Sequence, residues 1–268
     1  MDAASLDLAH ERDALAATVR AAGALALAKF QRPLKSWMKE GASPVSEADI
    51  AVDELLRERL LGARAGFGWR SEESAEASGN PPAKLVWIVD PIDGTRSYLA
   101  GQPDWVISVA LVAEGRPLVA ALLAPVTDEL FLAARGLGAT RNGAPVRTTG
   151  GGAVGALRIA GPKRYFEALA AVAPQMTAMP RLGSLALRLA RLAQGELDIV
   201  FASGSSHDWD LAGADLLVHE AGGTMTSLAG KGVIYNQPTS VHGALVAAGT
   251  ERHAAVLAHT RNWVAELR

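Results

Sequence analysis

Two carboxylates, Asp90 and Asp93, stand at the end of an apolar run and could bind a cation together. The run 86–89 is short, β-prone and bounded by turn residues, which predicts a buried strand. We expect that strand to end at Asp90, because Pro91 has no N–H group for a sheet ladder. Gly94 can adopt the backbone angles of a tight turn. Such a turn would direct both aspartates to one place, where their like charges require a cation or a shared proton.

The residues that follow the turn are suited to an anion. Thr95 precedes a short predicted helix over 96–100, and the first N–H groups of a helix have no partner within it. Backbone amides for a phosphate beside carboxylates for a hard cation are typical of a metal-dependent phosphatase. On this stretch alone, an ordinary Asp-Gly turn with both aspartates capping backbone groups remains an alternative.

A different phosphatase chemistry is also compatible with these residues. Haloacid-dehalogenase-type phosphatases carry a similar Asp-x-Asp-Gly-Thr string, in which the nucleophile and the acid are two residues apart near the chain start. Here Asp90 and Asp93 are three residues apart and lie well inside the chain. The spacing favours a metal pair over an aspartyl-phosphate intermediate.

Two helices and an antiparallel meander are predicted around this stretch. Apolar residues recur at helical spacing over 6–30 and again over 50–61. Ser46 is a natural N-cap for the second helix, so Asp49 in the first turn has an ordinary role in offsetting the helix dipole. Strands are predicted over 66–69, 105–112, 117–123 and 129–134, with a hairpin turn at 141–144 and a mobile polar connection over 75–84.

Strands alternate with helices in the second half of the chain. Asp210 stands at the start of a predicted helix over 209–223, where capping that helix would be its ordinary role. The other predicted elements are strands over 157–160 and 197–201 and helices over 164–172 and 185–194.

The composition excludes several classes of function. The 268 residues carry a formal net charge of −2 without a basic run, so a nucleic acid polymer is not an expected partner. There is no cysteine, which excludes disulfides, thiolate zinc sites and a cysteine nucleophile. The sequence shows no signal peptide and no membrane-spanning segment. We therefore expect a soluble, cytoplasmic protein with no membrane partner.

Four strings together resemble the inositol monophosphatase family: SPVSEAD at 43–49, SEES at 71–74, WIVDPIDGT at 87–95 and WDLAGADLLVHEAGG at 209–223. They occur in the family's order and at about its intervals. The resemblance implies an α/β (α+β) fold, a layered α-β-α-β-α sandwich of the inositol monophosphatase and fructose-1,6-bisphosphatase type. It further implies an N-terminal half, 1–150, with most metal ligands and a C-terminal half, 151–268, with the last one, packed as one compact unit. A homodimer is one expectation for the assembly.

The resemblance also implies a phosphomonoesterase that depends on Mg²⁺. Glu72, Asp90 and the carbonyl of Ile92 would hold one ion. Asp90, Asp93 and Asp210 would hold a second, and some family members have a third, looser ion near Glu72. Oxygen ligands of this kind are those that Mg²⁺ prefers.

The implied catalytic residues act on water. Thr95, oriented by Asp49 and helped by Glu72, would hydrogen-bond the water that attacks phosphorus directly, without a phospho-enzyme. The implied substrate contacts are Asp93, Gly94, Thr95, Gly183, Ser184, Ser203 and Asp210. Gly183 and Ser184 have the alternative role of an ordinary helix N-terminus.

The substrate is expected to be a small soluble phosphate ester. Inositol-specific family members have a glutamate where this chain has Ser203, and the change removes a charged acceptor for sugar hydroxyls. The strings at 43–49 and 71–74 favour a bisphosphate nucleotidase acting on 3′-phosphoadenosine 5′-phosphate. Inositol phosphate and histidinol phosphate remain alternatives.

Three ring side chains near the motifs are not expected to take part in the chemistry. His207 would either contact substrate or point to solvent from a loop, and we expect the latter. Trp87 and Trp209 are expected in the core. A catalytically silent family member that acts as a binding or regulatory protein is the alternative from another functional class. The presence of every implied ligand favours an active enzyme.

Overall fold

The computed structural model describes residues 6–39, 43–62, 64, 66–74, 83–151, 156–170, 173–260 and 263. Its helices are α1 (Leu8–Lys29), α2 (Glu47–Gly62), α3 (Thr95–Leu99), α4 (Lys163–Ala170), α5 (Leu185–Ala193), α6 (Asp208–Glu220) and α7 (Thr250–Thr260). None of these helices is long and apolar enough to cross a bilayer. The predicted connection over 75–84 and the end of the predicted helix over 164–172 fall largely or partly outside the described residues.

The first sheet has seven strands in the order of the chain. They are β3 (Gly68–Ser71), β4 (Leu85–Asp93), β5 (Val106–Ala113), β6 (Arg116–Ala124), β7 (Glu129–Ala134), β8 (Gly138–Arg141) and β9 (Ala144–Pro145). β3 and β4 are parallel and all later pairs are antiparallel, so the predicted meander is confirmed.

The second sheet has five strands in the order β11-β10-β12-β16-β14. They are β10 (Arg158–Ala160), β11 (Thr177–Ala178), β12 (Ile199–Ala202), β14 (Gly223–Ser227) and β16 (Leu245–Gly249). Two small ribbons complete the strands: β1 (Ser36–Met38) with β2 (Pro44–Ser46), and β13 (Ser206–His207) with β15 (Val241–His242).

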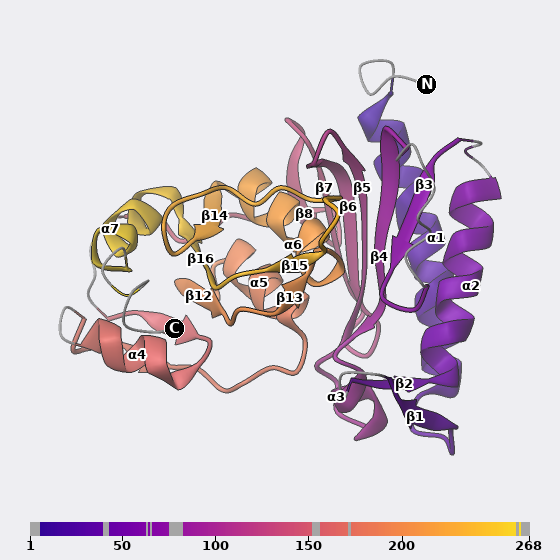
Figure 1. Cartoon of the computed structure of the whole chain (residues 1–268), viewed down its shortest axis with the longest axis horizontal. Helices are drawn as coiled ribbons and strands as arrows, with labels where there is room; N and C mark the ends of the chain where they lie inside the picture. Colours follow the sequence, from indigo (N-terminus) through magenta and orange to yellow (C-terminus); the bar gives the residue numbers. More distant parts are fainter. Residues whose placement is uncertain are drawn as a thin grey trace.

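Helices and sheets alternate in layers (Figure 1). α1 and α2 cover one face of the first sheet, α5 and α6 lie between the sheets, and α4 and α7 lie beyond the second sheet. The predicted α-β-α-β-α fold class is therefore confirmed. The division into halves at residue 150 stays a prediction.

β4 does not end at Asp90, as the sequence suggested, but continues to Asp93. Asp90 is opposite Ser108 and Asp93 is opposite Val106, so the register shifts between them and β4 has one extra residue. A bulge of this kind leaves a residue unpaired, which accommodates Pro91 because proline cannot donate to the ladder. The prediction was wrong in that a bulge, not a strand end, accommodates the proline.

Apolar packing fixes the end of β4 and the start of α6. All nine residues of β4 are buried, because α2 packs on one side of the sheet and α6 on the other. Trp87 is 2% exposed and belongs to the core beneath α1 and α2, as predicted. α6 contacts β4, β5 and β6 of the first sheet and β14 of the second. This packing holds the start of α6 against the end of β4.

Candidate metal centre

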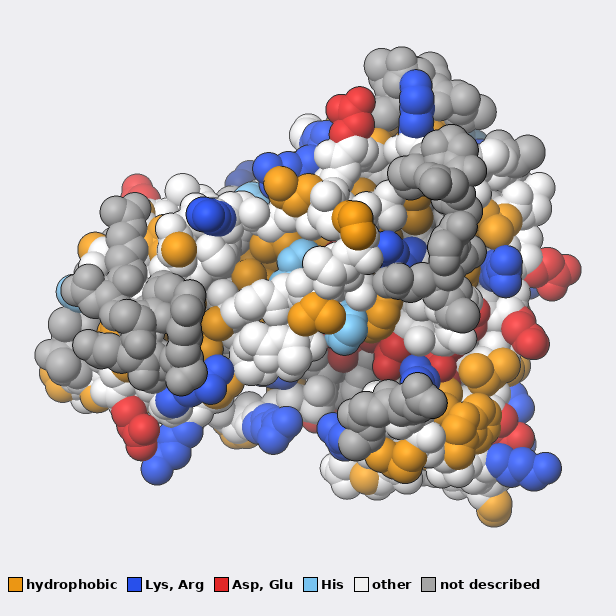
Figure 2. All heavy atoms as spheres, viewed as in Figure 1, with side chains coloured by type: hydrophobic (Ala, Val, Ile, Leu, Met, Phe, Trp, Pro, Cys, Tyr) orange, Lys and Arg blue, Asp and Glu red, His pale blue; other side chains and the backbone are white. Residues whose placement is uncertain are grey.

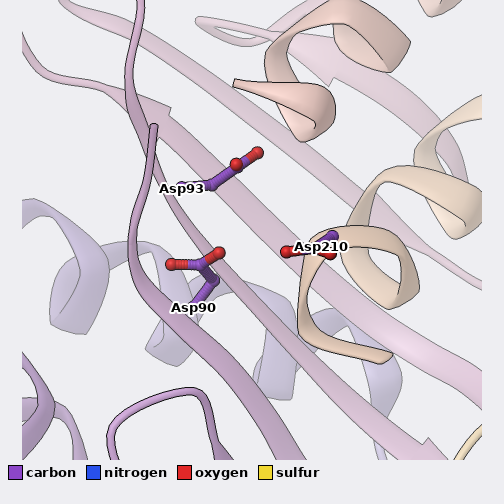
Figure 3. Close-up of side chains that lie close together, drawn as sticks. All are labelled: Asp90, Asp93 and Asp210. Carbon is purple, nitrogen blue, oxygen red and sulfur yellow. The ribbon is translucent and has the colours of Figure 1, made fainter. Parts of the chain in front are cut away.

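Three carboxylates from distant parts of the chain converge at one point (Figure 3). Asp90 and Asp93 come from the end of β4 and Asp210 from the first turn of α6, and each offers an oxygen within 4.8 Å of the others. In a regular strand, residues three apart point to opposite faces. The bulge in β4 adds one residue and lets both aspartates point the same way. The structure thus brings together the three predicted aspartates.

These carboxylates are buried among like charges. Asp90 is 1% exposed and Asp93 is 7% exposed. Burial, together with Glu72, Asp93 and Asp210, raises the pKa of Asp90 well above its usual range. Burial and Asp93 do the same to the pKa of Asp210. Since desolvation and repulsion both penalise the ionised carboxylates, a hard cation with oxygen ligands is the natural compensation.

Asp93 is fixed by the start of α5. Its Oδ2 accepts hydrogen bonds from Ser184 Oγ and from the Ala186 N–H, each at 2.6 Å. Burial raises the pKa of Asp93, while these two hydrogen bonds oppose the rise. Ser184 Oγ also accepts from the Leu187 N–H at 2.9 Å, so Ser184 caps α5. Ser184 is completely buried, which makes it a support for Asp93 rather than a surface for substrate.

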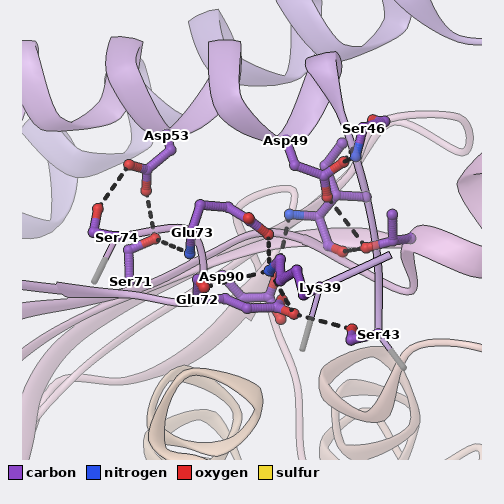
Figure 4. Close-up of polar contacts among 12 residues, drawn as sticks. Lys39, Ser43, Ser46, Asp49, Asp53, Ser71, Glu72, Glu73, Ser74 and Asp90 are labelled. Atoms are coloured by element: carbon purple, nitrogen blue, oxygen red, sulfur yellow. Dashed lines mark hydrogen bonds and ion pairs between the residues drawn. The ribbon is translucent and has the colours of Figure 1, made fainter. Parts of the chain in front are cut away.

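Glu72 lies in the same cavity as the aspartates but is held by a lysine that the sequence did not indicate (Figure 4). Lys39 Nζ lies 3.2 Å from Glu72 Oε1 and 2.6 Å from Glu73 Oε1. Burial raises the pKa of Glu73 to about 7, although Lys39 opposes this. Nothing in the local sequence places residue 39 beside residue 72, because the two meet only when the β1–β2 ribbon folds over the end of β3. The contact with the Lys39 ammonium group shows that Glu72 can pair with a cation.

Thr95 and Asp49 form a buried pair, as the resemblance implied. Thr95 Oγ1 lies 3.1 Å from Asp49 Oδ1 and 3.1 Å from the carbonyl oxygen of Ile92. Asp49 Oδ2 accepts from the Ser46 N–H at 2.8 Å and from Ser46 Oγ at 2.5 Å. Ser46 Oγ in turn accepts from the Ala48 N–H, which is a reciprocal cap at the start of α2. Asp49 therefore caps the helix with one oxygen and orients Thr95 with the other.

The backbone around Gly94 requires a residue without a side chain. Gly94 has φ of 99°, and a Cβ there would lie 3.1 Å from Asp104 O and 3.3 Å from Ser184 N. Gly183 is packed as closely, since a Cβ would meet Ser97 Oγ at 2.0 Å. Both glycines line the cavity that holds the aspartates. This close packing allows the chain of α3 to approach the start of α5.

The shared cavity has a volume of about 530 Å³. Among the residues that line it are Glu72, Asp90, Ile92, Asp93, Thr95 and Asp210. Asp104 and Arg181 also line it, and the sequence analysis named neither. Asp104 accepts a short hydrogen bond from the Gly183 N–H. In the space-filling view, acidic side chains lie in a recess at the centre of this face (Figure 2).

Two predicted positions lie elsewhere. Ser203 is exposed and lines a neighbouring cavity of about 320 Å³. The expectation that His207 points to solvent was wrong. His207 is half-buried, its ring stacks on Trp209 with centroids 4.6 Å apart, and its Nδ1 lies 3.0 Å from Ser240 Oγ. Its N–H donates to Asp210 Oδ2 at 2.7 Å, so backbone and ring both help to fix the start of α6.

The chain is similar to known proteins over most of its length. The model of the inositol monophosphatase family matches residues 7–264. An inositol-1-monophosphatase from Rhizobium meliloti is 37% identical over 207 residues, which cover 73% of this chain and 76% of that protein. A protein named Nus factor SuhB, from Pseudomonas aeruginosa, is 33% identical over 205 residues, which cover 72% of this chain and 75% of that protein.

Solved structures resemble this one over nearly its whole length. The extragenic suppressor protein suhB from Bartonella henselae has a TM-score of 0.81 at 27% identity, covering 93% of this chain and 97% of that one. An IMPase from Thermotoga maritima has the same TM-score of 0.81 at 24% identity, which supports the fold. From its family match, its relatives and its fold, the chain belongs to the inositol monophosphatase family.

Proposed function

We propose that this protein hydrolyses a small phosphate ester with the help of Mg²⁺. The observation that carries the proposal is the convergence of Asp90, Asp93 and Asp210 within 4.8 Å of one another. Glu72 and Thr95 line the same cavity. A buried, oxygen-only donor set with mutual repulsion fits Mg²⁺ better than it fits a softer metal.

The residues divide into two overlapping ligand sets. Glu72, Asp90 and the Ile92 carbonyl would hold one ion, and Asp90, Asp93 and Asp210 a second. A third, looser ion would bind near Glu72, in place of the Lys39 ammonium group. When bound, such ions supply a nucleophilic water and stabilise the charge on the phosphate.

The protein's own residues prepare the phosphate and the water. Asp49 orients the Thr95 hydroxyl, which lies on the cavity wall where it can hydrogen-bond the attacking water. Glu72 lines the same cavity, and its carboxylate would help Thr95 to hold the water and could accept a proton from it. Gly94 and Thr95 line the cavity, and their amides would hydrogen-bond phosphate oxygens, while Arg181 adds a positive charge to the same cavity. Gly183, which lies just before α5, lines this cavity too and is a further proposed substrate contact.

Turnover tests the proposal directly. The wild-type protein should hydrolyse p-nitrophenyl phosphate and a panel of natural phosphate esters in Mg²⁺ and lose this activity in EDTA. Thr95→Val removes only the hydroxyl and should lower kcat by about a hundredfold or more, in the range of a positioned acid–base group. Thr127→Val is the matched control, because Thr127 is exposed and bonded to Glu129 on the surface. Equal activity in both variants would remove Thr95 from the mechanism.

A binding role is the second candidate. Several relatives are named Nus factor SuhB, which is not the name of a phosphatase. If the protein hydrolyses none of the esters in Mg²⁺, the catalytically silent alternative replaces the proposal. The aspartyl-phosphate alternative is disfavoured because the family and fold are those of inositol monophosphatases. A cytoplasmic location and a homodimer stay predictions.

A further inference from the structure

A second, basic cavity adjoins the metal centre. It has a volume of about 320 Å³ and is lined by Lys163, Arg181 and Arg188, together with Ser203 and Gly161. Arg181 lines both this cavity and the one that holds the aspartates, so the two adjoin at that side chain. In Figure 2, basic side chains follow the lower edge of the molecule from the acidic recess toward α4. A substrate bound at the metal centre could reach into this second cavity.

Arg188 carries a charge without an ionic partner. It is half-buried, its Nε donates to Ser184 O at 3.3 Å, and within the part of the chain that the structure describes it forms no ion pair. Burial is the main cause that lowers the pKa of Arg188; Asp93 opposes the shift and Arg181 adds to it. Arg191, three residues later on α5, is bonded to both carboxylate oxygens of Glu129 at 2.7 and 2.5 Å. Of these two arginines on α5, Arg191 is therefore paired with a carboxylate of β7, whereas Arg188 lines the cavity.

The plainest alternative is that Arg188 only offsets the charge of the metal ligands. Asp93 and Asp210 are near enough to affect its pKa but make no ion pair with it. Each offers an oxygen within 4.8 Å of the other, and both residues line the first cavity. Cations bound by these aspartates would neutralise them, and the charge of Arg188 would then lack compensation. A half-buried cation in that state favours an anion in the adjoining space.

We propose that the second cavity binds a second anionic group of the same substrate, held by Arg188 and Arg181. This proposal rests on the proposed phosphatase function and narrows it to small molecules that carry a phosphate or a carboxylate besides the ester that is cleaved. Ser203 suits such a group, because its hydroxyl can donate to an anion where a glutamate would repel it. Lys163 is peripheral, since its side chain is 87% exposed and pairs with Glu167 at 3.2 Å.

Two matched pairs of substrates test the subsite and distinguish its two possible ligands. 3′-Phosphoadenosine 5′-phosphate against adenosine 3′-monophosphate tests a second phosphate. 2-Phosphoglycerate against glycerol 2-phosphate tests a carboxylate. In at least one pair, the wild-type protein in Mg²⁺ should favour the doubly anionic member by about ten- to a hundredfold in kcat/KM, as expected for charge-assisted hydrogen bonds. The ratio within a pair is the measured quantity, not the absolute rate.

Substitutions then assign the preference. Arg188→Met should bring the ratio close to one, and Arg188→Lys should keep part of it because the charge remains. Arg164→Met is the matched control: Arg164 is an exposed arginine on neighbouring α4 that is bonded to Tyr165 OH and does not contribute to the cavity lining described above. That variant should keep the wild-type ratio. Arg181→Met should lower the ratio less than Arg188→Met, because Arg181 is exposed.

The outcomes separate the two proposals. Wild-type ratios near one in both pairs, or an unchanged ratio in a folded Arg188→Met protein, would overturn the subsite while leaving the phosphatase intact. The phosphatase proposal fails if neither these four compounds nor p-nitrophenyl phosphate and the other esters of the panel are hydrolysed. Where none of the four compounds is hydrolysed, there is no kinetic ratio to measure. The subsite is then judged by calorimetric binding of 3′-phosphoadenosine 5′-phosphate and adenosine 3′-monophosphate to wild type and Arg188→Met. Equal affinities for the two nucleotides in the wild type would overturn it, and a preference that Arg188→Met abolishes would support it.

Discussion

Replacing Asp90 by asparagine should stabilise the metal-free protein and remove its response to Mg²⁺. Asp90 is 1% exposed, and among the residues that the structure describes one hydrogen bond reaches its side chain, from the Ile92 N–H to Oδ1 at 3.0 Å. An asparagine oxygen can keep that bond, so the substitution removes charge with little change of shape. The sign of the effect therefore reports the repulsion within the cluster.

The size of the effect follows from the spacing of the carboxylates. Two unit charges 4.8 Å apart, the upper limit within the cluster, repel by about 3.5 kcal/mol at an effective dielectric constant of about 20. Proton uptake by the aspartates relieves part of this cost, since the pKa of Asp90 is raised. We expect a net gain of about 1–3 kcal/mol in the free energy of unfolding, or roughly 2–10 °C in Tm for a chain of this size.

Asp208→Asn provides a matched control with the opposite sign. Asp208 is also completely buried, but it lies 2.9 Å from Arg70 Nη1 and 2.7 Å from His242 Nε2. Removing its charge leaves the largely buried Arg70 guanidinium uncompensated, which should destabilise the protein by about 3 kcal/mol. Circular dichroism melts of the three proteins in EDTA and in excess MgCl₂ measure both effects. A lower Tm for metal-free Asp90→Asn, or equal Mg²⁺ stabilisation of wild type and Asp90→Asn, would refute the reasoning.

Three further predictions concern the metal centre and the cavity beside it. The pKa of Glu73 is raised from 4.5 to about 7, so the folded state binds more protons than the unfolded state between these two pH values. Metal-free wild type should therefore lose stability relative to Glu73→Gln as the pH rises from 4.5 to about 7. Urea titrations that show no such loss would contradict the shift. Asp93→Asn should keep the fold, since its oxygen can still accept from Ser184 and Ala186, but should lower Mg²⁺-dependent turnover by about a hundredfold or more; near wild-type turnover in saturating Mg²⁺ would exclude Asp93 as a ligand. Ser203→Glu places a carboxylate in the cavity of Arg188, so kcat/KM for 3′-phosphoadenosine 5′-phosphate should fall about tenfold relative to inositol 1-phosphate; an unchanged ratio would show that position 203 does not set specificity.

Local patterns predicted the helices α1 to α6, the longer strands up to β12 and the candidate ligands, but not β14, β16 and α7. Helical spacing of apolar residues predicted α1 and α5, and short β-prone apolar runs predicted β5, β6 and β7, whose residues are nearly all buried. The family strings identified Asp90, Asp93 and Asp210, which the structure brings together. The predicted end of the strand at Asp90 was wrong, because Pro91 alone does not reveal whether a strand ends or forms a bulge. Only the pairing of β4 with β5 decided that.

What the sequence by itself determined was the family, the order of the elements from α1 to α6 apart from the shortest strands, and the candidate acidic ligands, since each of these depends on residue types at short spacing. Tertiary structure decided which side chains share a cavity. It placed Lys39 on Glu72, buried Ser184 behind Asp93, and put Ser203 with Arg188 outside the metal cavity. These contacts join residues that are distant in the chain, and they depend on how α5 and α6 pack between two sheets. Packing of that kind is a property of the whole set of layers, so no single stretch of sequence contains it.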